Sequence, residues 1–491
     1  MIGNPGIVRI NLRFLVKILI LLIFVLGNFF NLNAGWADNG DFYRVATWFS
    51  TGPIINETWP VTGTEAWYRR FYSYYIPEWN LDMTNKSEMF SSAVLLWYPG
   101  VFLNRYFYSA STLYLPIMSL GARVLLFIFL LLVFDWIDRR SSHPLFNYFT
   151  IGLPLALLFS TTDITAFFNS FYQENAVIIF VPYLVAVILM GRRMERGWSY
   201  YLLYVLVLFL VVTSKSASIF WPALALPFVI PFFQVLRQPL KIIGLVAVLV
   251  ILPTLLGLIL TEVPNTTYIR PYNGLFTGTL MLSENPQQRL IELSIPDLYY
   301  CIGSDFYSTK EGHDCAYKHP GKITYLAIMK TMLHEPKIIV KQVYYVIYSI
   351  QNYSLHLGKY IYGDNVLRQE RWLNFWSILK LYTFPKGWLF LGIIPILLAL
   401  IGLAWKSKDI TGDLAVSALV FLCAFWIDSL IEIWVDGQRD LLKHLAMPNM
   451  FFDYAWIASL NIIVLLAIGW VRENRKVIAI PKFKGIPKLH G

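Results

Sequence analysis

The chain has 491 residues, of which 57% are hydrophobic and only 14% are charged. Soluble domains carry roughly 25% charged residues, so this chain has too few to cover a water-soluble surface. The apolar content excludes disorder, and three cysteines in so long a chain exclude a secreted disulfide scaffold. The net charge of +10 comes from short basic clusters between apolar runs, which indicates membrane topology rather than nucleic-acid binding. We therefore expect an all-α polytopic membrane protein with no nucleic-acid partner.

Apolar runs long enough to cross a bilayer recur along the chain, since a spanning helix needs about 20 mostly apolar residues. We expect about ten spans, near residues 14–31, 115–134, 146–162, 174–190, 199–214, 217–235, 241–261, 387–405, 413–434 and 449–471. The first run follows Arg9, Arg13 and Lys17 and ends without a small-residue cleavage site. We interpret it as a retained first helix rather than a cleaved signal peptide.

Basic residues mark every second connection between these spans. They are Arg139, Arg140, Arg192, Arg193, Arg196, Arg237, Lys406 and Lys408, followed by a basic tail after residue 471. The positive-inside rule requires this alternation for an even number of spans with both termini in the cytoplasm. We therefore expect a transmembrane module at 1–261, a large outer segment at 262–386, and a transmembrane module at 387–491 that ends in a cytoplasmic tail.

Two large segments, residues 32–114 and 262–386, then lie on the extracytoplasmic side. Each contains a moderately apolar stretch, Ala93–Phe107 in the first and Ile338–Ile350 in the second. We expect these stretches to form amphipathic helices at the membrane interface, with aromatic rings at headgroup depth. Function on the outer side is favoured because the non-helical chain is concentrated there.

The first outer segment begins with two carboxylates, Asp38 and Asp41, close to the outer end of the first span. Side chains three residues apart converge within one helical turn. Such a pair suits a base that takes a proton from a hydroxyl, or the ligands of a divalent cation such as Mg²⁺ or Mn²⁺. A solvated turn is the alternative, because Asp, Asn and Gly are common turn residues.

Polar residues also gather where two later spans meet the outer face. Arg123 lies in the outer part of the second span, where a charge is costly unless it faces a cavity or a partner. Asn169, Tyr172 and Glu174 lead into the fourth span. Their donors and acceptors beside aromatic rings suit a sugar site; alternatively, Glu174 complements the helix dipole and the others are caps and interface anchors.

Two of the three cysteines, Cys301 and Cys315, fall in the second outer segment. In an oxidising compartment, two cysteines so close in sequence favour a disulfide that closes a small loop. A metal site that adds His313 and a pair of free thiols are the alternatives. The third cysteine, Cys423, lies within a span, and we expect it to serve packing.

A mixed charge cluster ends the ninth span and continues beyond it. Asp428, Glu432 and Asp436 are spaced by four residues and so share one helix face. The cations Arg439, Lys443 and His444 follow directly. These cations suit the binding of a lipid phosphate at headgroup depth, whereas the alternative is ordinary interfacial ion pairing of Arg439 and Lys443 with Asp436 and Asp440.

Three of these stretches together resemble the bacterial GT-C superfamily of polytopic glycosyltransferases. The first is the Asp-bearing outer loop, here Asn39-Gly40-Asp41-Phe42-Tyr43-Arg44. The second, Asn169-Ser170-Phe171-Tyr172-Gln173-Glu174, is similar to a segment of hexosyltransferases that assemble cell-surface glycans. The third, from Asp436 to Leu445, is similar to their late acidic-Gly and Lys-His-Leu stretch.

The resemblance implies sugar transfer from a polyprenyl-phosphate-linked donor to a glycan or lipid-linked acceptor at the outer face of the bacterial inner membrane. It implies that Asp41 is the general base, with Asp38 as helper or metal ligand, and that the anomeric carbon inverts. The other residues that it implicates in substrate binding are Arg44, Arg123, Asn169, Tyr172, Glu174, Arg439, Lys443 and His444.

Two other classes of protein compete with this interpretation. A transporter or flippase of lipid-linked glycans predicts a charged path through the membrane and broken helices near the midplane. The candidate charges cluster toward the outer face instead, which favours an enzyme. A non-catalytic subunit of a glycan-assembly complex predicts that the purified protein neither binds nor consumes a lipid-linked sugar.

Overall fold

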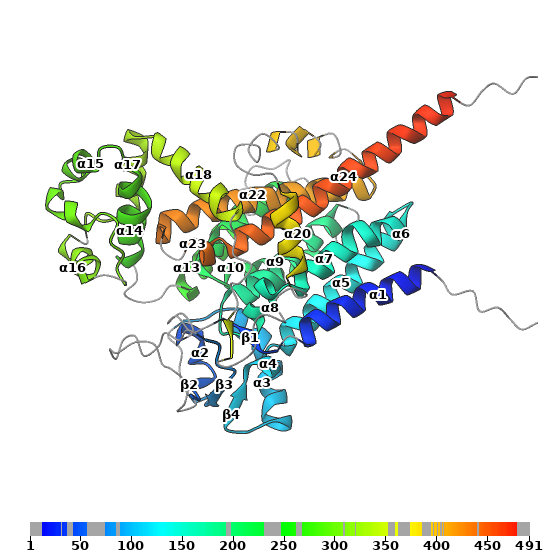
Figure 1. Ribbon diagram of the computed structural model, residues 1–491, viewed down its shortest axis with the longest axis horizontal. Helices are drawn as coiled ribbons and strands as arrows, with labels where there is room; N and C mark the ends of the chain where they lie inside the picture. The colour runs from blue at the N-terminus through cyan, green and yellow to red at the C-terminus, as the bar shows by residue number, and fades with distance from the viewer. Residues whose placement is uncertain are drawn as a thin grey trace, which may run out of the picture.

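The computed structural model describes most of the chain, with gaps between the described ranges. The described residues are 12–30, 32–36, 43–55, 74–84, 89–192, 198–229, 247–261, 268–307, 310–319, 321–351, 359–361, 374–384, 394–395, 397–399, 401–402, 405, 407–438 and 441–478. Helices dominate this part of the chain (Figure 1).

Five helical segments are long and apolar enough to cross a membrane: Leu12–Phe29, Leu115–Arg140, Glu174–Gly191, Ile410–Asp436 and Ala446–Val471. A sixth candidate is a broken pair, Pro144–Ser160 and Thr162–Phe168, bent by 57°. Shorter apolar helices cover Ser199–Val212, Ser216–Pro227 and Leu249–Thr261. These elements fall on nine of the ten expected spans; most of the remaining one, 387–405, lies outside the described residues. The chain is an integral membrane protein with five or six such helices among the residues described.

The spanning helices form one bundle with a continuous apolar core. Helix α22 (Ile410–Asp436) packs along α24 (Ala446–Ile478), and α9 (Glu174–Gly191) packs against α10 (Trp198–Val212). Helix α1 (Leu12–Phe29) lies against α7 (Leu153–Ser160). The close approach of α1 and α7 depends on Gly27, because a Cβ there would lie 2.2 Å from that of Ser160.

One end of the bundle is basic, and the two terminal helices reach it together. In Figure 1, α1 begins and α24 ends on the same side, beside the link between α5 (Leu120–Arg140) and α6 (Pro144–Asn147). Arg140 donates to Lys408 O at 2.8 Å and lies 3.6 Å from Asp413. Arg192 donates to Gly412 O at 2.9 Å. The structure thus gathers basic residues from three connections that the sequence assigns to the cytoplasm.

The first outer segment builds a small layer at the opposite end of α5. Strands β2 (Ser50–Pro53), β3 (Glu78–Leu81) and β4 (Thr112–Tyr114) form an antiparallel sheet, in which Trp79 pairs with Leu113. The helices of this segment are α2 (Tyr43–Ala46), α3 (Ala93–Phe107) and α4 (Leu115–Met118). The bounds of α3 match the expected amphipathic stretch, and its large exposed hydrophobic side chains are Leu95, Phe102, Leu103, Tyr106 and Phe107.

The second outer segment forms a lobe with a core of its own, at the left of Figure 1. Its α-helices are α14 (Ile269–Asn273), α15 (Pro286–Glu292), α16 (Lys310–Lys318), α17 (Tyr325–His334) and α18 (Lys337–Gln351). It also contains a short π-helix, η6 (Gly274–Thr279), and two short 3-10 helices, η7 (Leu280–Leu282) and η8 (Pro296–Cys301). Cys301 and Cys315 form the disulfide favoured by the sequence, and it joins η8 to α16.

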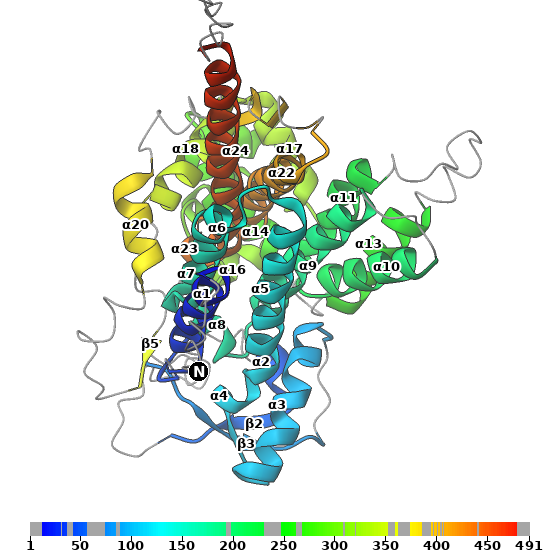
Figure 2. The same cartoon turned by 90° about the vertical axis from the view of Figure 1, so that its right-hand side faces the viewer.

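A two-stranded sheet connects the two outer segments. β1 (Ala34–Gly35) pairs antiparallel with β5 (Lys359–Tyr360), so that Ala34 faces Tyr360 in the register. Figure 2 shows β5 beside the bundle, below α20 (Phe375–Thr383). These two small sheets are a difference from the all-α expectation. They arise because these segments, which lie outside the long apolar helices, pair their backbone groups as strands.

Three further helical stretches complete the bundle. η2 (Tyr148–Gly152) leads into α7, and α8 (Thr162–Phe168) follows it. After α10 come η3 (Ser216–Phe220), α11 (Trp221–Val229), η5 (Ala247–Ile251) and α13 (Leu252–Thr261). The short helix α23 (Leu441–His444) joins α22 to α24.

Candidate functional site

A buried cluster of alternating charges lies where α9 begins and α22 ends. Lys215 Nζ lies 2.7 Å from Glu432 Oε1 and 3.1 Å from Glu174 Oε1. Glu174 and Glu432 are each at most 5% exposed. Burial alone lowers the pKa of Lys215, but the carboxylates of Glu432 and Glu174 outweigh it and raise this pKa above its usual value. Lys215 is therefore a fixed cation that holds two spanning helices together.

The loop that carries Lys215 is fixed by the first outer segment. Ser92 N donates to Thr213 O at 3.0 Å, and the Ser91 hydroxyl donates to Ser214 O at 2.7 Å. The Ser92 hydroxyl also donates to Leu210 O at the end of α10. Carbonyls at a helix end need such partners when they are buried. The start of α3 thus sets the position of the lysine.

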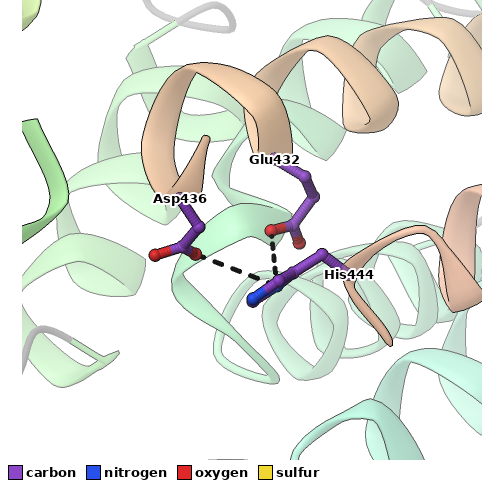
Figure 3. Close-up of side chains that lie close together, drawn as sticks. All are labelled: Glu432, Asp436 and His444. Carbon is purple, nitrogen blue, oxygen red and sulfur yellow. Dashed lines mark ion pairs between the residues drawn. The ribbon is translucent and has the colours of Figure 1, made fainter. Parts of the chain in front are cut away.

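His444 extends the cluster from the other side (Figure 3). Its Nδ1 atom lies 3.0 Å from Glu432 Oε2 and 3.8 Å from Asp436 Oδ2. Burial alone lowers the pKa of His444, but Asp436 and Glu432 raise it above the usual value for histidine. Both acids lie on one face of α22, as their spacing predicts.

A tight turn at Gly437 allows His444 to meet these acids. Gly437 has φ of +67°, and a Cβ on it would lie 1.9 Å from the Thr277 hydroxyl. Only glycine can adopt this positive φ and fit beside Thr277 without strain. The turn ends α22 against η6 of the outer lobe, and α23 then returns along the bundle with Lys443 and His444.

Aromatic rings connect this cluster to the segment before the first-loop carboxylates. Lys443 Nζ lies 4.7 Å above the ring centroid of Tyr172, a cation–π distance. The rings of Tyr172 and Trp36 meet edge-on at 5.6 Å. Trp36 is held by its own backbone N–H, which donates to the Ser170 hydroxyl at 2.7 Å. Three distant parts of the chain therefore meet beside Tyr172.

Arg123 and Asn169 form a second, separate buried group. Arg123 is fully buried and donates to the Ser119 hydroxyl at 2.8 Å and to the Asn169 side-chain oxygen. Asn169 in turn donates to Ala34 O at 2.6 Å. These bonds join Arg123, Asn169 and the backbone of β1, which indicates that they fix β1 against α8. The structure gives Arg123 protein partners, and its contact with a lipid phosphate stays a prediction.

A third polar group ties α20 to the bundle. Lys380 Nζ lies 2.6 Å from Asp453 Oδ1, and both side chains are at most 8% exposed. The Ser377 hydroxyl donates to Asp163 Oδ2 at 2.8 Å. All of these residues lie within apolar or moderately apolar stretches. Of these residues, only Asp453 lies within an expected span, where a charge needs a partner.

The predicted residues Asp38, Asp41 and Arg439 lie outside the described part of the chain. Arg44 lies in α2 and is half-buried. Of the remaining candidates, the structure brings Glu174, Tyr172, Lys443 and His444 into one cluster with Glu432. Lys215 was missed because a single lysine in a short connection carries no spacing pattern; its place between two apolar runs was the available signal.

Comparison with known proteins identifies the family. The model of the YfdI N-terminal transmembrane domain matches residues 5–479, so the chain belongs to this family. One relative is an uncharacterized protein, YfdI of Escherichia coli (strain K12), which is 24% identical over 416 residues. That match covers 79% of this chain and 84% of the relative. No solved structure matches the chain significantly.

Proposed function

We propose that this member of the YfdI transmembrane family is an inverting membrane glycosyltransferase. It transfers a hexosyl group from a polyprenyl-phosphate-linked donor to a hydroxyl of a glycan or lipid-linked glycan. The observation that carries the proposal is the meeting of Lys443, Tyr172 and Trp36 beside the Lys215 cluster. A cation, aromatic faces and carboxylates in one place are the groups that a phosphate-linked sugar requires.

The charges at the two ends of α9 support a reaction at the outer face of the membrane. Glu174 begins this helix and Arg192 follows it, and 18 helical residues rise about 27 Å. That length is close to the thickness of the hydrocarbon core, about 30 Å. If the basic end faces the cytoplasm, the Lys215 cluster meets the outer leaflet, where lipid-linked donors and nascent surface glycans would reach it. The proposal therefore includes the bacterial inner membrane and cytoplasmic termini.

The membrane arrangement belongs to the same proposal. About ten spans of GT-C type would require the shorter apolar helices to cross together with neighbours or to enter only part of the bilayer. Helix α3 would lie at the outer interface, because its exposed side chains are large and apolar and include Tyr106, which is 83% exposed. Its orientation would present these rings to headgroups while its buried face holds the Lys215 loop.

In the proposed reaction, the acceptor hydroxyl attacks the anomeric carbon of the donor sugar from the face opposite the phosphate. The new C–O bond forms as the bond to the phosphate oxygen breaks, and the phosphate leaves with the electron pair. Asp41 takes the hydroxyl proton, with Asp38 as its helper. Lys443 stabilises the developing phosphate charge, and this electrostatic contribution needs no covalent participation by the protein. Tyr172 and Trp36 offer faces for the sugar ring.

The direct test uses purified full-length protein in nanodiscs with a panel of radiolabelled polyprenyl-phosphate hexoses and bacterial lipid-linked glycans. We expect transfer to one acceptor class and its loss in Asp41→Asn, which keeps the shape but removes the base. Asp314→Asn is the matched control, because Asp314 is an exposed carboxylate of the outer lobe. Absence of transfer from every donor, or full activity of both Asp41→Asn and Asp38→Asn, would reject the proposed mechanism.

A further inference from the structure

Three side chains that can bind a metal meet at the end of α22, two from α22 and one from α23. Glu432 and Asp436 lie on successive turns of α22, and His444 approaches them from α23 after the turn at Gly437 (Figure 3). One ligand atom from each residue lies within 4.8 Å of the other two. Ligand atoms about 2.1 Å from a shared ion lie about 3–4 Å from one another. The His444 distances of 3.0 and 3.8 Å fall in this range.

The charges around these three residues leave room for another cation. Among the described residues, the carboxylates of Glu174, Asp428, Glu432 and Asp436 share this region with three bases, Lys215, Lys443 and His444. Asp428 is 5% exposed and makes no hydrogen bond or ion pair with any described residue. It lies within electrostatic reach of Glu432 and Lys215. Burying more acids than bases is costly unless a further cation or a proton compensates the excess.

The same excess of negative charge would disfavour binding of the proposed donor phosphate. A donor phosphate is repelled by carboxylates at short range, and this cluster holds more carboxylates than bases among the described residues. A divalent cation that binds carboxylates on one side and phosphate oxygens on the other removes this conflict. Lys215 holds the second oxygen of Glu432 at 2.7 Å, so this carboxylate is oriented for a ligand on its His444 side.

We infer that Glu432, Asp436 and His444 form a binding site for one divalent transition-metal ion, manganese or zinc in class. Two carboxylates and an imidazole are a mixed oxygen and nitrogen ligand set that suits such ions. Three protein ligands leave coordination positions open for phosphate oxygens. The bridging role rests on the proposed function, whereas binding of the metal itself does not.

The experiment titrates Mn²⁺ into full-length protein in nanodiscs after removal of metal with EDTA, and measures free Mn²⁺ by electron paramagnetic resonance. We expect one site per chain in the wild type and at least about tenfold weaker binding in Asp436→Asn and His444→Gln. The matched control is His334→Gln, because His334 forms an exposed histidine–carboxylate pair with Glu292 at 2.8 Å. This control should bind Mn²⁺ like the wild type.

The outcomes separate the metal site from the transferase proposal. No stoichiometric binding by the wild type, or unchanged binding by folded Asp436→Asn and His444→Gln, overturns the metal site. The side chain of Asp436 is 23% exposed, so its amide variant keeps the packing and guards against a folding artefact. One bound Mn²⁺ in a protein that transfers no sugar supports the metal site and rejects the function. Sugar transfer without any Mn²⁺ binding supports the proposed function and rejects the metal site.

Discussion

Lys215 and Glu432 lie 217 positions apart in the chain, yet their charged atoms are 2.7 Å from each other. The pair joins the loop after α10 to the end of α22, and Glu174 adds the start of α9. Removing one partner of a buried ion pair leaves the other charge uncompensated. The stability of this corner of the bundle should therefore depend on the charge of one side chain.

We expect Lys215→Met to destabilise the protein by about 3–5 kcal/mol, because two buried carboxylates lose their cation. Thermal unfolding in one detergent and at one pH measures the change. Lys215→Arg keeps the charge and should retain most of the stability. Equal melting temperatures for wild type and Lys215→Met would show that the pair contributes nothing to folding.

Tyr172 offers a test of the aromatic contact with Lys443. Tyr172→Leu removes the ring beneath the ammonium group, and a cation–π contact contributes about 0.5–2 kcal/mol. If Lys443 binds the donor phosphate, the apparent affinity for the polyprenyl-phosphate hexose should fall about two- to thirtyfold. Tyr172→Phe keeps the ring and is the control. A loss of affinity as large in Tyr172→Phe would point to the hydroxyl instead.

Arg123 should behave as a structural residue. Arg123→Met removes the charged donor of the Asn169 oxygen and leaves it only the Ser119 hydroxyl at 3.3 Å. Weakening the hydrogen bonding of a buried polar group costs about 1–3 kcal/mol. We expect lower thermal stability with unchanged donor affinity in the protein that remains folded. Arg105→Met is the control, because Arg105 is exposed on α3. Weaker donor binding at unchanged stability would restore Arg123 to the phosphate site.

The disulfide between Cys301 and Cys315 closes a short loop in the outer lobe, with a sequence separation of 14. In the chain-entropy model, a loop of this length contributes about 3 kcal/mol. We expect Cys301→Ser with Cys315→Ser to increase hydrogen exchange in η8 and α16 while the bundle keeps its protection. Cys423→Ser should change neither region. Uniform loss of protection across the bundle would contradict the independence of the lobe's core.

The outer lobe should also lose stability in acid. The hydrogen bond from His334 lowers the pKa of Glu292 below its usual 4.5. A carboxyl with a lowered folded-state pKa contributes stability above its unfolded pKa and loses it as the pH falls through the folded value. Between about pH 5 and pH 3, wild type should lose more thermal stability than Glu292→Gln. Glu311→Gln, an exposed change on α16, should follow the wild type.

The sequence predicted the elements better than their contacts. Long apolar runs locate Leu12–Phe29, Glu174–Gly191 and Ile410–Asp436 because the bilayer itself dictates their length and composition. The sequence also predicted that Glu432 and Asp436 share a face, since helical spacing is local. The partners of Arg123, Ser119 and Asn169, could not be predicted because they depend on tertiary packing.

Pairings between distant segments have no local signature. The two-residue strand Ala34–Gly35 pairs with Lys359–Tyr360, and no hydropathy pattern marks either of them. Lys215 finds Glu174 and Glu432 only through the packing of three helices. The small sheets and the composition of the charged cluster therefore could not be predicted from the sequence.

The 18 residues of α9 carry a carboxylate at the first position and are followed by an arginine, both tied to α22. Neither charge can shift along the helix without breaking those ties, so the apolar interval between them has a fixed length. In bilayers of longer or shorter acyl chains, the helices must then tilt or the bilayer must change thickness around the protein. Either response costs fractions of a kcal/mol per Å of hydrophobic mismatch. Reconstitution in a series of phosphatidylcholines should accordingly give an optimum chain length that wild type and Arg123→Met share.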